Sequence, residues 1–78
     1  MHIKARITKL SNCENPRNPN NIEDGFTTTG FMNSYPEEGE FFYLGNFRSS
    51  RVKKILNLTT FETQNSIYKL EEINENSN

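Results

Sequence analysis

Hydrophobic and polar residues alternate along much of the chain, as they do in strands that bury one face. In residues 2–10, Ile3, Ala5 and Ile7 alternate with polar residues, which predicts a strand with one apolar side. Further segments rich in β-branched and aromatic residues predict strands over 26–32, 40–44, 48–56, 58–63 and 66–73. Apolar residues recur at helical spacing in two short windows that are themselves rich in β-branched or aromatic residues, so strands are favoured over helices there.

Turn-forming residues separate these segments. Residues 11–24 are rich in Asn and include two prolines, which predicts a long loop. Residues 34–39 predict a turn, and Gly30 marks a bulge or bend within its strand. Gln64 and Asn65 form a two-residue connection typical of a hairpin between the last two strands.

Short strands with frequent turns and no helical crossover predict an all-β fold. We expect a small antiparallel meander of five or six strands, rolled into an SH3-like barrel or half-barrel, with an OB-like barrel as the alternative. Residues 1–73 would form one domain, and residues 74–78 a disordered tail. The strand over 40–44 can be covered on both faces, and most of the six Phe residues should lie in the core.

Composition limits both size and location. The chain has 78 residues, with 9 basic and 10 acidic side chains and a formal net charge of −1, so one domain with a small core is expected. One cysteine, Cys13, excludes an intramolecular disulfide framework, which favours the cytoplasm. No segment has the apolar run of a signal peptide or of a membrane span, so no membrane association is expected.

The side chains needed for catalysis are scarce. His2 lies at the chain end, and Cys13 has no basic neighbour in sequence to activate its thiol. The acidic pairs 37–38 and 71–72 would point to opposite faces of a strand or lie in a turn. No spacing of His, Cys or Asp suggests a metal site. We therefore predict no catalytic residues, no metal and no cofactor.

A basic segment is the first candidate binding site. Its charged and hydroxyl side chains could contact phosphate in a nucleic acid or nucleotide: Arg48, Ser49, Ser50, Arg51, Lys53 and Lys54. On a regular strand Arg51 and Lys53 would share one face, and Arg48 and Lys54 the other. The net charge of −1 argues against a nucleic-acid domain, so a solvated, ion-paired strand is the favoured interpretation.

The long loop and the turn after it are the second candidate. Binding residues concentrate on loops that a rigid sheet holds in place. Six polar or aromatic side chains there are candidate protein contacts: Arg17, Glu23, Asp24, Tyr35, Glu37 and Glu38. The alternative is that residues 11–24 are a tolerated insertion of mobile polar residues.

The second half of the chain carries a recognisable pattern. Phe41-Phe42-Tyr43 is followed by Arg48-Ser49-Ser50-Arg51-Val52 and by Phe61-Glu62-Thr63-Gln64-Asn65-Ser66-Ile67-Tyr68-Lys69-Leu70. In these residues the chain resembles a group of small, mostly uncharacterised proteins encoded by phages and prophages. The group more often has Thr-Ser where this chain has Ser49-Ser50. The resemblance implies a phage or mobile-element origin and a short all-β fold, and it brings no established active site.

These observations favour a function in binding rather than in catalysis. The leading hypothesis is a non-catalytic phage or mobile-element accessory protein that binds a host or phage protein in the host cytoplasm, with inhibition of a bacterial defence system as a candidate role. The alternatives are nucleic-acid or nucleotide-phosphate binding through residues 48–54, and a structural role in the virion or its assembly, which a homo-oligomer would indicate. The sequence identifies neither the partner, nor the oligomeric state, nor the buried face of the 48–56 strand.

Overall fold

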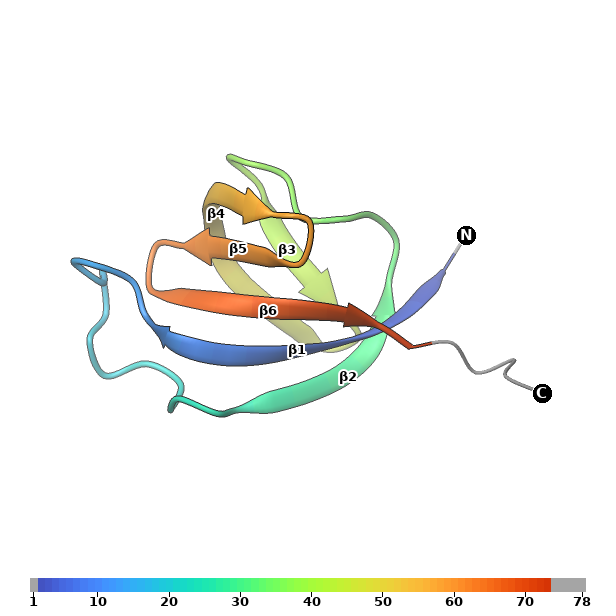
Figure 1. Ribbon diagram of the computed structural model, residues 1–78, viewed down its shortest axis with the longest axis horizontal. Helices are drawn as coiled ribbons and strands as arrows, with labels where there is room; N and C mark the ends of the chain where they lie inside the picture. The colour runs from blue at the N-terminus through green and yellow to red at the C-terminus, as the bar shows by residue number, and fades with distance from the viewer. Residues whose placement is uncertain (1, 74–78) are drawn as a thin grey trace.

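The computed structural model of the protein describes residues 2–73 (Figure 1). It contains six strands: β1 (Ile3–Asn12), β2 (Thr27–Met32), β3 (Phe41–Leu44), β4 (Phe47–Asn57), β5 (Thr60–Thr63) and β6 (Ser66–Glu72). The six predicted strands are all present, although β1 continues to Asn12 and the long loop therefore begins later than expected. The described residues include no helix that could cross a membrane. The predicted tail, 74–78, lies outside the described residues.

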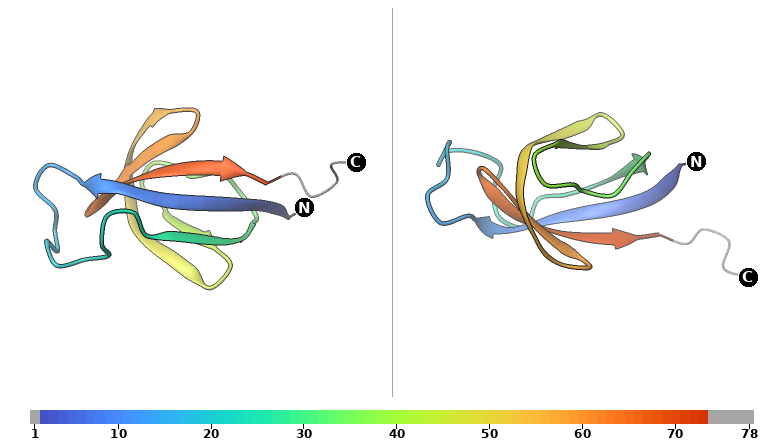
Figure 2. Two further views of the ribbon diagram at one scale, coloured as in Figure 1. Left: turned by 60° about the horizontal axis from the view of Figure 1, so that its bottom comes forward. Right: turned by 90° about the horizontal axis from the view of Figure 1, so that it is seen from above.

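The strands form one antiparallel sheet in the order β2-β1-β6-β5-β4-β3. Strands that follow one another in the chain are neighbours in the sheet, except β2 and β3, and β1 pairs with β6. The sheet curls into a nearly closed barrel whose two edge strands approach each other (Figure 2). The prediction of a small all-β barrel built as a meander is confirmed.

The seam between β2 and β3 depends on two glycines. The Gly45 amide donates to the Phe31 carbonyl oxygen at 2.9 Å, which joins the end of β3 to β2. A Cβ added at Gly30 would lie 3.0 Å from the Gly45 nitrogen and 3.1 Å from its Cα. Gly30 is therefore required by close backbone approach, as its position inside a strand suggested.

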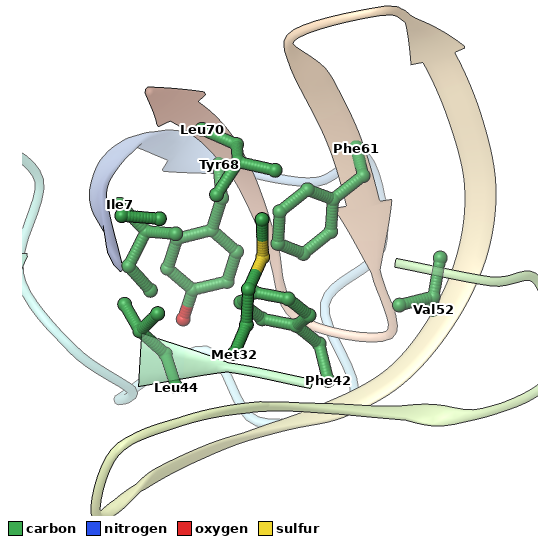
Figure 3. Packing of buried hydrophobic residues seen from close by; sticks show 9 residues of the cluster. Ile7, Met32, Phe42, Leu44, Val52, Phe61, Tyr68 and Leu70 are labelled. Carbon is green, nitrogen blue, oxygen red and sulfur yellow. The ribbon is translucent and has the colours of Figure 1, made fainter. Parts of the chain in front are cut away.

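The core lies inside the curl of the sheet. The rings of Phe42, Phe61 and Tyr68 point toward one another, with centroids 5.2 Å apart between Phe42 and Phe61 and 5.5 Å apart between Phe61 and Tyr68 (Figure 3). Aliphatic and sulfur-containing side chains surround these rings: Ala5, Ile7, Met32, Leu44, Val52 and Leu70.

Two predictions about the core are wrong in part. Most of the six phenylalanines were expected in the core, but two of them, Phe42 and Phe61, belong to it; Phe47 packs partly against it, and Phe26 and Phe31 are 37% and 53% exposed. The strand over 40–44 is covered on one face, because Phe42 and Leu44 are buried while Tyr43 is 58% exposed. The reason is that β3 is an edge strand whose outward face has no second layer.

We expect Gly30→Ala to lower the free energy of unfolding by about 1–3 kcal/mol, because its methyl group would press against the Gly45 backbone. Denaturant unfolding measures the change. Thr29→Ala, at the exposed neighbouring position, is the control and should alter stability by less than about 0.5 kcal/mol. Equal stability of Gly30→Ala and the wild type would contradict the close approach at the seam.

Candidate functional site

Lys9 is a buried cation that organises the loop between β1 and β2. Its side chain is 2% exposed, and its ammonium donates to Asn12 Oδ1 at 2.6 Å, to Asn21 Oδ1 at 2.8 Å and to the Ile22 carbonyl oxygen. Asp24 Oδ1 lies 3.5 Å from the same Nζ and supplies a negative charge. All three ammonium protons thus have an acceptor, which is the condition for burying a lysine at low cost.

The loop is also attached to the turn between β5 and β6. The Cys13 amide donates to the Asn65 carbonyl oxygen at 2.9 Å, and the Arg17 amide donates to the Gln64 carbonyl oxygen at 3.0 Å. The Asn18 amide donates to Asn65 Oδ1 at 2.7 Å. The loop and this turn lie at the same end of the barrel (Figure 1). The alternative in which the loop is a mobile insertion is therefore disfavoured by the number of its attachments.

Sequence reasoning missed Lys9 and misplaced Cys13. The alternation that assigns Ile3, Ala5 and Ile7 to the inner face also assigns Lys9 to it, so the signal was the position in the strand. Cys13 was expected in an open loop, but it is 5% exposed and its thiol donates to the Gln64 carbonyl oxygen at 3.3 Å.

A bulge in β4 changes how the basic segment is presented. Phe41 pairs with Arg51 and Tyr43 pairs with Arg48, so three steps along β4 oppose two steps along β3. The extra residue reverses the alternation, and both guanidinium groups lie over the Phe41 ring, at 4.7 Å for Arg48 and 4.5 Å for Arg51. The prediction that Arg48 and Arg51 occupy opposite faces is wrong, because it assumed a regular strand.

Other members of the basic segment are engaged elsewhere. The Ser49 hydroxyl is buried, accepts from the Phe42 amide at 3.1 Å and donates to the Ser50 carbonyl oxygen at 2.6 Å, so its proton is already used within the barrel. Its role as a phosphate contact stays a prediction. Lys53 Nζ lies 3.5 Å from Glu62 Oε2. Lys54 is exposed further along β4.

The loop and β4 together enclose a polar depression, which we call the arginine hollow. It has a volume of about 540 Å³. Its lining combines two arginines with amide, hydroxyl and aromatic groups: Arg17, Asn18, Phe41, Arg48, Ser49, Ser50, Gln64 and Asn65. Arg17 and Arg48, which belonged to different candidate sites in the sequence, are thus brought to one place.

A second depression, the hairpin hollow, lies beside the β4–β5 turn and is largely apolar. Its volume is also about 540 Å³. Buried Phe61 and Leu70 contribute to its lining, together with the more exposed residues Tyr35, Pro36, Ile55, Asn57, Leu58, Thr59, Thr60 and Glu72. Leu58 is 98% exposed, which leaves a large apolar side chain in water. Neither Ile55 nor Leu58 was singled out from the sequence, which placed Leu58 in a strand over 58–63, whereas β5 begins at Thr60.

The predicted protein-contact residues do not form one site. Tyr35 lines the hairpin hollow and donates its hydroxyl proton to Glu72 Oε2, and this hydrogen bond raises the pKa of Tyr35 above its usual value. Glu38 Oε2 accepts from the Ile55 amide at 3.4 Å, near the same hollow. Arg17 lines the arginine hollow.

The acidic candidates of the loop and turn have local roles. Asp24 faces the Lys9 ammonium, and the carbonyl oxygen of exposed Glu23 accepts from the Phe26 amide at 3.1 Å. The carbonyl oxygen of Glu37 accepts from the Glu40 amide at 3.1 Å, which closes the turn before β3. Asp24 therefore contributes to the structure of the loop.

Comparison with protein-family models, curated proteins and solved structures gives no match. Within residues 2–73, no group of three or more His, Cys, Asp or Glu side chains is placed to hold a metal ion. Inferences about function therefore start from the two hollows.

We expect Lys9→Met to lower the free energy of unfolding by about 2–4 kcal/mol, since it removes the charged donor from Asn12 Oδ1, Asn21 Oδ1 and the Ile22 carbonyl oxygen. Limited proteolysis should then cleave within residues 13–26. Lys69→Met, which removes an exposed lysine, is the control and should leave the cleavage pattern unchanged. A protease-resistant loop in Lys9→Met would show that other contacts are sufficient to hold it.

The Tyr35–Glu72 hydrogen bond predicts a dependence of stability on alkaline pH. Below about pH 10 the phenol is protonated in both folded and unfolded chains, so the bond contributes fully. Above that pH the unfolded chain loses the proton first, and stability falls as pH rises toward the raised pKa of the folded state. Tyr35→Phe and Glu72→Gln should each reduce this fall in denaturant unfolding measured across the alkaline range. An unaltered fall in both variants would contradict the assignment.

Proposed function

We propose that the protein is a non-catalytic binding module that engages another protein through the hairpin hollow. The observation that carries this proposal is the exposure of Leu58, at 98%, beside Ile55 and Tyr35, which are 39% and 49% exposed and line the same depression. A single exposed apolar residue is common on soluble proteins. Several around one concave surface are typical of an interaction site, because a partner removes them from water.

The small number of apolar residues strengthens the argument. Leu, Ile, Val and Phe together contribute 18 of 78 residues, and six of them form the buried core with Ala5, Met32 and Tyr68. Placing Leu58 outside the core, with Ile55 and Leu56 about 40% exposed beside it, gives up stabilisation that so small a domain could use. Burial against a partner would recover it.

An open strand edge borders the same surface. The pairing of β4 with β3 ends at Arg51, and backbone hydrogen bonds to Gly39 and Glu40 continue it to Val52. Beyond Val52, no strand among residues 2–73 pairs with this edge of β4, and the Ile55 amide is reached by the Glu38 carboxylate. An extended segment of a partner could add to this edge while its side chains enter the hollow.

The resemblance to phage proteins supports a more specific form of the proposal. In that context the partner is a host or phage protein, and the effect arises when the complex covers a functional surface of that partner. Inhibition of a bacterial defence system is the role we propose within this class. The alternative role, a structural protein of the virion, would use the same surface to bind a second copy of this chain.

The test is affinity capture from producing cells with wild-type and variant bait. We expect Leu58→Asp to lose a partner that the wild type retains, since a buried carboxylate at the interface is costly. Leu10→Asp is the matched control, because Leu10 is 47% exposed and does not line the hollow, and it should capture the same partner.

Light scattering on the purified protein separates the outcomes. A monomer that captures a partner through Leu58 supports the proposal. An oligomer that Leu58→Asp dissociates indicates the structural role. Equal capture by wild type and Leu58→Asp would refute the use of the hairpin hollow.

A further inference from the structure

The arginine hollow carries a second inference, which is independent of the hairpin hollow. Four segments line it, namely the loop after β1, β3, β4 and the β5–β6 turn; the loop contributes Arg17, and β4 contributes Arg48. Both arginines are exposed, and both line the same depression. Their meeting requires the loop to be attached to Gln64 and the bulge in β4 to be in place.

The charge of this depression is unbalanced. Its lining contains no acidic residue, although the whole chain has one more acidic than basic side chain. Within residues 2–73, neither Arg17 nor Arg48 has a carboxylate oxygen within 4.0 Å, whereas Lys53, further along β4, is paired with Glu62. The hollow is therefore a local positive surface on a slightly acidic protein.

The arginines are held in place by neutral groups. The Arg48 guanidinium lies over the Phe41 ring, 4.7 Å from its centroid. The Arg51 guanidinium lies over the same ring, and its Nη1 donates to the Gly39 carbonyl oxygen at 2.9 Å. Arg17 Nη1 donates to Gln64 Oε1 at 3.2 Å. Because a guanidinium has five N–H groups, these contacts orient the side chains and leave donors for a ligand.

We propose that the arginine hollow binds the phosphate of a nucleotide. A guanidinium matches phosphate oxygens with two parallel hydrogen bonds, and two of them around one hollow suit a ligand with more negative charge than a carboxylate. The amides of Asn18, Gln64 and Asn65 provide hydrogen-bonding groups for a base or sugar, and the volume of about 540 Å³ is within the range of small-molecule sites. A free nucleotide and a single-stranded nucleic acid share this chemistry.

The test is equilibrium binding of a fluorescent oligothymidylate, followed by fluorescence anisotropy at about 50 mM salt, where phosphate contacts are strong. Arg17→Ala and Arg48→Ala should each weaken binding about tenfold, as expected for loss of a charged hydrogen-bond donor. Arg48→Lys should restore part of the affinity, because it keeps the charge and loses the planar fork. Lys54→Ala is the matched control: this exposed cation on the same strand does not line the hollow, and its loss should change affinity less than about twofold.

Competition with ATP distinguishes the two sources of the phosphate. Displacement of the oligonucleotide by ATP indicates a mononucleotide site. If ATP does not displace it and its affinity depends steeply on salt, the ligand is a single-stranded nucleic acid that makes several phosphate contacts. No binding at low salt, or equal weakening by Lys54→Ala and Arg48→Ala, would overturn the proposal. Leu58→Asp should bind the oligonucleotide as the wild type does, so the failure of either proposal can be recognised separately.

Discussion

The loop that brings Arg17 to the arginine hollow depends on one buried ammonium group. Lys9 occupies an inward position of β1, immediately after the residues that build the core, and it draws Asn12, Asn21 and Ile22 around itself. Without a cation at this point, the oxygens of Asn12, Asn21 and Ile22 would face one another without the charged donor that holds them together. The chain thus uses charge to order a segment that has too few apolar residues to pack. Arg17 is positioned as a consequence.

Irregularities in the strands determine which side chains meet. A β-bulge adds one residue to one strand of a pair, so the side chains beyond it change faces. In β4 this brings Arg48 and Arg51 to the same ring, while Val52 still enters the core. In a regular strand Arg48 would share a face with Val52 and would lie on the opposite face from Arg51. Because of the bulge, Val52 can point into the core while Arg48 and Arg51 both lie at the surface.

Much of the fold was predictable, because alternation and turn chemistry are local properties. The strands, the hairpin at Gln64 and Asn65 and the meander follow from patterns within a few residues of each other. The candidate sites were harder to predict from the sequence. The bulge at β4 depends on pairing with β3, and the contact of Arg17 with Gln64 joins residues 47 positions apart. Such contacts leave no trace in one sequence. Lys9 is different, because its inward position could have been read from the alternation in β1.

The pairing of β1 with β6 has a consequence for how the chain reaches its fold. Ala5 lies opposite Glu72, so one of the central contacts of the sheet joins residues from the two ends of the described chain. Contacts between distant residues must overcome a large loss of chain entropy before they contribute energy, and folds that depend on them form slowly. The hairpins of β3 to β6 involve near neighbours and can form first. During synthesis β1 emerges early and can pair with β2. Its other edge stays unpaired until β6 has been made. The pairing of β1 with β6 therefore costs more chain entropy than any of the local hairpins.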